Sequence, residues 1–259
     1  MTISIDRYPE RIRASIAGSL AAEMAVHLPS GALHMLSVAE SLADRGEYDA
    51  EDLRARGLTS LPPCGPAGIL VRVVPYGLCL PADRPNVRKS AYRAALLAGV
   101  DEGTAAIAVA TAVLAADLLR FDLATALLRV RQTLLEEAPM PVLQRLVPLG
   151  DGEAVGAAED PMAALQLAIT VLNRTTGVTQ AIEGVRAVAP LAAVAASLAG
   201  ALAGCRDGLA GPDGGTESTD WLAGIPAAEA AEAASVRLAE RTAVWLTSAW
   251  TPNITATAG

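Results

Sequence analysis

The stretch "VRAVAPLAAVAASLAGALAG", residues 185–204, carries one charged residue, Arg186, and one hydroxyl group, Ser197, among small and aliphatic side chains. Such a stretch is typical of a membrane span, of a buried helix or of the wall of a site. A span needs about 20 apolar residues, but Pro190 interrupts this stretch and alanine-rich segments insert weakly. We therefore expect a buried central helix, whose small residues let neighbouring backbones approach closely.

The composition of the whole chain also favours helices. Of the 259 residues, 52% are hydrophobic but only 3% are aromatic, so Ala, Leu and Val must fill the core. Ala and Leu favour helix, and the β-branched or aromatic runs that are typical of strands are nearly absent. No linker separates two independently patterned halves. The sequence predicts an all-α fold in a single domain over residues 1–259.

Apolar residues recur at the spacing of one helix face over most of the chain. Asp49, followed three positions later by Asp52, resembles a capping box at the start of one such segment. The pattern predicts helices over residues 6–27, 31–45, 49–56, 86–99, 101–119, 121–137, 139–146, 160–175, 178–204 and 226–249. Clusters of Gly and Pro separate several of them, and residues 206–219 are predicted to form a surface loop.

Charge and cysteine content exclude several classes of protein. The net charge of −8 and the pI near 4.8 argue against nucleic-acid binding, and the single lysine, Lys89, leaves no polybasic segment for anionic lipid. The charged N-terminus does not fit a signal peptide. The three cysteines are widely spaced, so neither a disulfide framework nor structural zinc is expected. We expect a cytoplasmic monomer or homodimer that binds a small molecule, with no nucleic-acid partner and no membrane association.

Four stretches, in order, resemble motifs of the ADP-ribosylglycohydrolases of the dinitrogenase-reductase-activating type. They are "DRYPERIRASIAGSLAAEMA" (6–25), "ALHMLSVAESLADRGEYDAEDLRAR" (32–56), "GILVRVVPYGLCLP" (68–81) and "LAAVAASLAGALAG" (191–204), the last followed by "DWLAGIP" (220–226). The resemblance covers about residues 6 to 240. It implies an all-α, orthogonal multi-helix bundle with a cleft that holds two magnesium ions.

The positions where the family carries its magnesium ligands are apolar in this chain. The resemblance aligns the family's Thr-Asp-Asp-Thr run with residues 30–33, Ser-Gly-Ala-Leu, and its Asp-Thr-Asp-Thr run with residues 187–190, Ala-Val-Ala-Pro. The loop that usually carries an acidic catalytic residue shrinks to residues 24–29. Magnesium needs hard oxygen donors, usually including carboxylates. We therefore predict no metal site, no cofactor and no ADP-ribosyl hydrolysis by the family mechanism.

His34 and Glu23 are the candidate catalytic residues. His34 follows the altered first ligand run, and it is one of two histidines that can transfer protons near neutral pH. Glu23 is the acid retained on the face where the family has its active site. The alternatives are a histidine with one backbone hydrogen bond and a partly exposed carboxylate paired with an arginine.

Arg186 is the candidate anchor for an anionic group of the substrate, because it lies beside the altered second ligand run. The alternative is a surface ion pair with Glu183, three residues earlier. The resemblance places further substrate-binding candidates around the cleft, namely Arg72, Gln166, Tyr76, His27, Leu33 and Val188. For Arg72 the alternative is a structural role in bonding carbonyls, for Tyr76 a core position, and for His27 an interaction with a helix dipole.

Two functions fit these residues. The first is a metal-independent enzyme whose apolar cleft takes a small organic substrate for isomerisation, cyclisation, elimination or hydrolysis by positioning and acid–base catalysis. The second is a catalytically inactive relative that binds a nucleotide or a protein and regulates it. An enclosed apolar cavity of roughly 300 Å³ beside His34 or Arg186 would favour the enzyme, and a filled core would favour the inactive relative.

Overall fold

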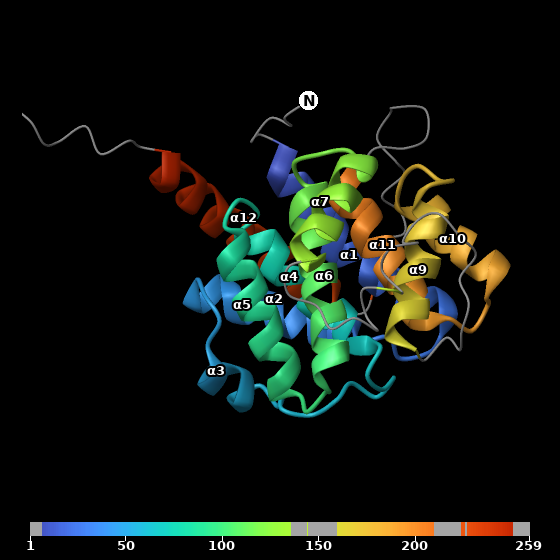
Figure 1. Cartoon of the computed structure of the whole chain (residues 1–259), viewed down its shortest axis with the longest axis horizontal. Helices are drawn as coiled ribbons and strands as arrows, with labels where there is room; N and C mark the ends of the chain where they lie inside the picture. The colour runs from blue at the N-terminus through green and yellow to red at the C-terminus, as the bar shows by residue number, and fades with distance from the viewer. Residues whose placement is uncertain (1–6, 136–143, 145–159, 210–223, 226, 251–259) are drawn as a thin grey trace, which may run out of the picture.

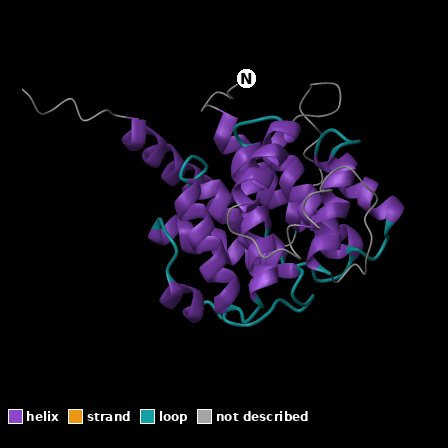
Figure 2. Cartoon of the chain, viewed as in Figure 1, coloured by secondary structure: helices purple, strands orange, loops and turns teal. Residues whose placement is uncertain are grey.

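The computed structural model describes residues 7–135, 144, 160–209, 224–225 and 227–250. Within these residues the chain forms helices joined by loops and turns, with no strand (Figure 2). The helices are α1 (Tyr8–Val26), α2 (Ala32–Arg45), α3 (Ala50–Ala55), α4 (Gly68–Cys79), α5 (Arg84–Leu97), α6 (Glu102–Leu118), α7 (Leu123–Leu135), α9 (Pro161–Leu172), α10 (Val178–Val188), α11 (Ala193–Asp207) and α12 (Ala228–Trp250). The prediction of an all-α fold is confirmed.

Helices α1 and α11 form the closest helix pair near the centre of the molecule (Figure 1). A Cβ atom placed on Gly200 would lie 2.4 Å from the carbonyl oxygen of Gly18, and one on Gly204 would lie 2.3 Å from the backbone nitrogen of Ser15. These distances leave no room for a side chain. The small residues of α11 therefore bring the two backbones together, as the sequence predicts.

The prediction of one continuous helix over residues 178–204 is wrong. Helix α10 ends at Val188 and α11 begins at Ala193, with Pro190 in the connection. Proline has no backbone N–H and its ring collides with the preceding helical turn, so the helix stops there. The side chains of Val188 and Leu191 are 68% and 76% exposed, whereas Ala193 to Cys205 are buried. The buried helix that we expected over the whole quoted stretch begins only at Ala193.

Helix α11 also extends beyond its predicted end. Arg206 and Asp207, which were assigned to the surface loop 206–219, form its last residues, and Leu209 is buried. Residues 210–219 of that predicted loop lie outside the described residues. The helix predicted over 139–146 lies outside them too, residue 144 aside.

Helix α4 is a helix that the sequence pattern did not predict. Its sequence contains Val71, Val73 and Val74 and then Pro75, all of which disfavour helix by intrinsic propensity. Every residue of α4 is buried, and a Cβ atom on Gly77 would lie 2.3 Å from the carbonyl oxygen of Ala112 in α6. Packing against α2 and α6 thus outweighs the poor local propensity.

The predicted helix start at Asp49 is confirmed by its cap. The carboxylate of Asp49 accepts hydrogen bonds from the backbone N–H groups of Glu51 (2.8 Å) and Asp52 (3.0 Å) at the start of α3.

In α6, the buried carboxylate of Asp117 pairs with Arg84 at 2.6 Å and with Arg129 at 3.4 Å. None of the described helices combines the length and the apolar character that a membrane crossing requires.

Candidate functional site

Four helix ends meet at one corner of the molecule: the C-terminus of α1 and the N-termini of α2, α4 and α11. Gly31, at the start of α2, faces the backbone of Gly68 so closely that a Cβ atom on Gly31 would lie 2.8 Å from the Gly68 carbonyl oxygen. The Ser197 hydroxyl in α11 lies 3.0 Å from the Ser19 carbonyl oxygen in α1. We call this region the α1/α2 corner, and it contains both candidate catalytic residues.

Glu23 caps α2. Its Oε2 atom accepts hydrogen bonds from the backbone N–H groups of Ser30 (2.9 Å) and Ala32 (3.1 Å) and from the Ser30 hydroxyl (2.6 Å). The N-cap residue, Gly31, has no side chain to do this, and a negative charge at a helix N-terminus is favourable. The Oε1 atom of Glu23 has no hydrogen bond to any described residue.

Three buried serines extend the network behind Glu23. The Ser197 hydroxyl lies 2.6 Å from the Ser30 hydroxyl, so α11, α2 and the end of α1 are joined through polar atoms in an otherwise apolar contact. The Ser19 hydroxyl is buried with no hydrogen-bond partner in the described part of the chain. The sequence analysis did not predict these serines as site residues, although Ser197 is the single hydroxyl in its apolar stretch.

His34 lies in the first turn of α2 and is half-buried. Its Nδ1 atom is buried and has no hydrogen-bond partner among the described residues. Burial lowers the pKa of the His34 imidazole, the positive charge of Arg72 lowers it further, and the negative charge of Glu23 acts in the opposite direction. The imidazole is therefore mainly neutral at pH 7, which is the form that can accept a proton.

Cys64 lies at the same corner and was not predicted there. A Cβ atom on Gly68 would lie 2.2 Å from the Cys64 Sγ atom, which places the thiol against the start of α4. Burial, with a smaller contribution from the charge of Glu23, raises the pKa of the Cys64 thiol to about 11. The thiol is therefore protonated at neutral pH and is a poor nucleophile.

Arg72 and Tyr76 are buried in α4. The Arg72 guanidinium donates hydrogen bonds to the carbonyl oxygens of Leu58 and of Ser60, the latter at 3.2 Å, and its Nε atom has no partner among the described residues. Burial raises the pKa of the Tyr76 phenol, and its ring lies 6.4 Å from that of Tyr48. Arg72 acts on the corner through its charge on His34, whereas Tyr76 faces the ring of Tyr48.

The remaining candidates are placed further from Glu23 or at the surface. Arg186 is exposed in the last turn of α10 and forms no ion pair with any described residue, Glu183 included. Leu33 and Val188 are 48% and 68% exposed. His27 is exposed and ends α1 in the left-handed conformation, with φ of 57°. Gln166 lies half-buried in α9.

Comparison with known proteins identifies the fold. The sequence matches no protein-family model and no curated protein. A solved structure described as "ADP-ribosylglycohydrolase-related protein complex" superimposes with a TM-score of 0.62, covering 92% of this chain and 99% of that chain, at 18% sequence identity. The chain has an ADP-ribosylglycohydrolase-like fold. At this identity the likeness concerns the fold alone, which hosts different functions in different proteins.

The residues at the α1/α2 corner do not fit the magnesium pair that the resemblance to ADP-ribosylglycohydrolases implies. Glu23 is the one carboxylate placed there by the described contacts, and its Oε2 atom is already engaged by three donors. The neighbouring oxygens are neutral serine hydroxyls, and residues 31–33 add no side-chain donor. No group of three His, Cys, Asp or Glu side chains suited to a metal ion occurs within the described ranges. Magnesium favours several hard, anionic oxygen ligands, so this donor set is unsuitable.

Proposed function

We propose that this protein is a metal-independent enzyme built on the ADP-ribosylglycohydrolase-like fold, acting on a small, rather apolar organic substrate by positioning and proton transfer. The observation that carries the proposal is His34, whose buried Nδ1 atom has no hydrogen-bond partner among the described residues and whose pKa is lowered by burial. An unpaired buried polar atom is costly to a fold, and titratable groups with perturbed pKa values are concentrated at functional sites. The charge and cysteine content support a cytoplasmic location, and the protein is proposed to work as a monomer or homodimer.

His34 serves as the general base. The neutral imidazole accepts a proton from an acidic C–H or O–H bond of the substrate, and the electron pair of that bond stays on the substrate as a new double bond or an enolate. The imidazolium that forms is stabilised by the negative charge of Glu23. Return of the proton to a different substrate atom completes an isomerisation, and loss of a leaving group instead completes an elimination.

Glu23 is both a structural and a chemical group in this proposal. Its Oε2 atom is held by the start of α2, so the carboxylate is fixed in position, and its Oε1 atom is left to contact a substrate. The exposed side chains of Leu28 (40%) and Leu33 (48%), on either side of the α2 start, support an apolar substrate. Water exclusion by such a substrate would strengthen the electrostatic interaction between Glu23 and His34.

Proton transfer can be tested before the substrate is known. The full-length protein is incubated in D₂O with a panel of small ketones, unsaturated acids and lactones, and deuterium incorporation is followed by mass spectrometry. The wild type should exchange at least one compound, and His34→Gln should lose that exchange while keeping its circular dichroism spectrum. Arg174→Gln, a change at an exposed residue of the α9–α10 connection, is the control and should behave as the wild type.

Three results would overturn the proposal. If ADP-ribosylated peptides were hydrolysed in the presence of magnesium and not after EDTA treatment, the protein would use the metal chemistry that its corner is proposed to have lost. If exchange were seen and His34→Gln kept it in full, the base would be another group. Strong thermal stabilisation by ADP-ribose together with magnesium would count against the proposal in the same way.

A second candidate function is a catalytically inactive relative that binds a nucleotide or a protein partner. The observation that favours it is the use of Glu23 Oε2 as a helix cap, since all three of its donors belong to the protein itself. This candidate predicts ligand binding without exchange or turnover. Two results together would select this candidate. The protein would exchange no compound in D₂O, and ADP-ribose would raise its Tm equally with or without magnesium and in His34→Gln.

A further inference from the structure

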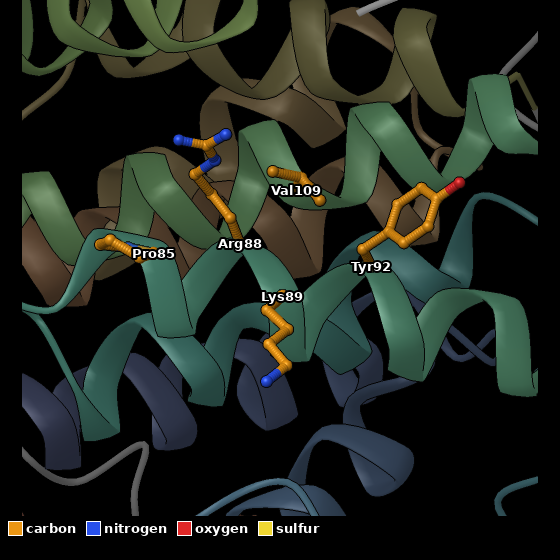
Figure 3. Close-up of a pocket in the computed structure, with 5 residues that line it drawn as sticks. All are labelled: Pro85, Arg88, Lys89, Tyr92 and Val109. Atoms are coloured by element: carbon orange, nitrogen blue, oxygen red, sulfur yellow. The ribbon is translucent and has the colours of Figure 1, made fainter. Parts of the chain in front are cut away.

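Helix α5 is the most basic segment of an acidic protein. It carries Arg84, Arg88, Lys89 and Arg93 with no acidic residue between residues 84 and 97, although the net charge of the chain is −8. Two cavities lie along it. The larger, about 430 Å³, is lined by Pro85, Arg88, Lys89, Tyr92 and Val109 (Figure 3). Figure 3 shows that Arg88 and Lys89 point to opposite sides of α5, and Lys89 also lines the second cavity.

The second cavity, of about 230 Å³, lies where three distant parts of the chain meet: the turn after α2, helix α5 and helix α12. Its lining combines cationic, neutral polar and aromatic side chains with one acid. The residues are Gly46, Glu47, Tyr48, Leu80, Asn86, Lys89, Ser90, Arg93 and Trp245. We call it the α5/α12 cavity.

The walls of the α5/α12 cavity are held by contacts behind them. The Thr242 hydroxyl lies 3.1 Å from the Leu78 carbonyl oxygen, and the Arg241 guanidinium donates to the Ala43 carbonyl oxygen at 3.0 Å. These bonds fix α12 against α4 and α2 one turn before Trp245. On the opposite wall the Tyr48 ring packs against the buried Tyr76 ring. The cavity is thus formed before any ligand binds, which lowers the entropic cost of binding.

The charge in the α5/α12 cavity is positive. Lys89 and Arg93 are exposed and form no ion pair or hydrogen bond with the described residues, while Glu47 is the one acidic residue in the lining. Burial raises the pKa of the Tyr48 phenol, and the negative charge of Asp49 raises it slightly further, whereas the positive charges of Arg54, Arg93 and Arg72 act in the opposite direction. The charges around Tyr48 are therefore positive on balance.

We propose that the α5/α12 cavity binds a small aromatic anion, with its ring beside Tyr48 and Trp245 and its carboxylate or phosphate held by Lys89 and Arg93. The volume of about 230 Å³ is below the roughly 300 to 1,000 Å³ of pockets for drug-sized ligands, so it suits one ring with one anionic group. Aromatic walls favour a planar ring, and lysine and arginine both bind oxyanions. The site does not involve His34 or Glu23, so it stands apart from the proposed catalytic corner.

The test is isothermal titration of the full-length protein with benzoate, phenyl phosphate and benzamide. At least one of the two anions should bind, and comparing them shows whether the cavity prefers a carboxylate or a phosphate. Neutral benzamide should bind at least about tenfold more weakly, because it has no negative charge to pair with Lys89 and Arg93. Binding of the anion should also weaken as the salt concentration rises.

Variants locate the binding site. Lys89 and Arg93 are exposed, so Lys89→Gln and Arg93→Gln should not disturb the fold. Each variant should lower the affinity for the anion by about tenfold, which is the lower part of what a charge-assisted hydrogen bond contributes. Arg174→Gln removes the same charge far from the lining residues and should leave the affinity unchanged. His34→Gln should also leave it unchanged, which separates this site from the proposed active site.

Three outcomes would overturn this proposal. They are the absence of binding by both anions, equal binding of benzamide, and equal weakening by Arg174→Gln and Lys89→Gln. The last outcome would show that the anion responds to the total charge of the protein and not to this cavity.

Discussion

Replacement of Gly200 by alanine is the sharpest test of how α1 and α11 are packed. The added methyl group would lie 2.4 Å from the carbonyl oxygen and 2.8 Å from the carbonyl carbon of Gly18, both backbone atoms that cannot rotate away. Ordinary contacts begin near 3.4 Å, so the two helices would have to separate by about 1 Å at this point. The same separation would strain the Ser197 contacts one turn earlier in α11, which connect to the Glu23 network.

The magnitude follows from two opposing effects. Alanine is favoured over glycine within a helix by about 1 kcal/mol, which stabilises the variant. Overpacking of a rigid contact costs up to about 3 kcal/mol. We expect a net loss of about 2 kcal/mol in the free energy of unfolding, which corresponds to a Tm lower by about 4 to 8 °C for a chain of this size.

Urea denaturation followed by circular dichroism measures this loss, and Gly184→Ala in α10 is the matched control. At Gly184 the nearest atom to the added methyl group is the Val171 Cγ1 atom at 2.7 Å, which belongs to a side chain. The gain in helix propensity should therefore largely offset the clash, and the control should stay within about 1 kcal/mol of the wild type. A Gly200→Ala protein as stable as the wild type would refute the close packing of α1 on α11.

Three further predictions concern the α1/α2 corner. Glu23→Ala leaves three hydrogen-bond donors without their acceptor and should lower the free energy of unfolding, measured by urea titration, by about 2 to 4 kcal/mol. Glu23→Gln keeps an acceptor oxygen and should lower it by about 1 kcal/mol in the same measurement. The pKa of His34 is lower in the folded than in the unfolded chain, so the unfolded chain binds a proton more readily and the stability should fall as the pH drops below about 6.5. Thermal melts of His34→Gln should show a weaker fall in Tm over the same pH range. A pH profile unchanged by His34→Gln would contradict the burial of this imidazole. His27→Gly removes a side chain from a residue in the left-handed conformation and should raise the free energy of unfolding by about 0.5 to 1 kcal/mol, as measured by calorimetry. A loss of stability would instead show that the His27 side chain makes a stabilising contact.

The helical content and the identity of the central packing helix could be predicted from local sequence. Alanine and leucine propensity and three-to-four-residue periodicity located most of the helices to within about two or three residues, as in α2 and α6. The caps at Asp49 and Asp160 follow from chemistry within three residues of the helix start. Where one helix was missed, at α4, valines and Pro75 gave the wrong local signal, because the helix depends on burial from all sides.

The candidate site could be predicted only in part. His34 and Glu23 were selected by residue type and by the family resemblance, and the structure does bring them to one corner. Arg186 was selected because it lies beside residues 187–190. It is instead exposed at the end of α10, because Pro190 breaks the helix and turns the chain. Whether His34, Glu23 and Arg186 act on a substrate stays a prediction.

The sequence by itself determined that the chain is helical and that a stripe of small residues allows one helix to pack closely. These properties belong to single residues or to neighbours along the chain. Only the tertiary structure decided which groups lose contact with water and which charges they face. It brought Ser197 to Ser30, which binds Glu23, left His34 Nδ1 without a hydrogen-bond partner among the described residues, and assembled the α5/α12 cavity from residues that include 46, 89 and 245. Desolvation and electrostatic fields depend on all the elements packed around a group, and local sequence does not encode them.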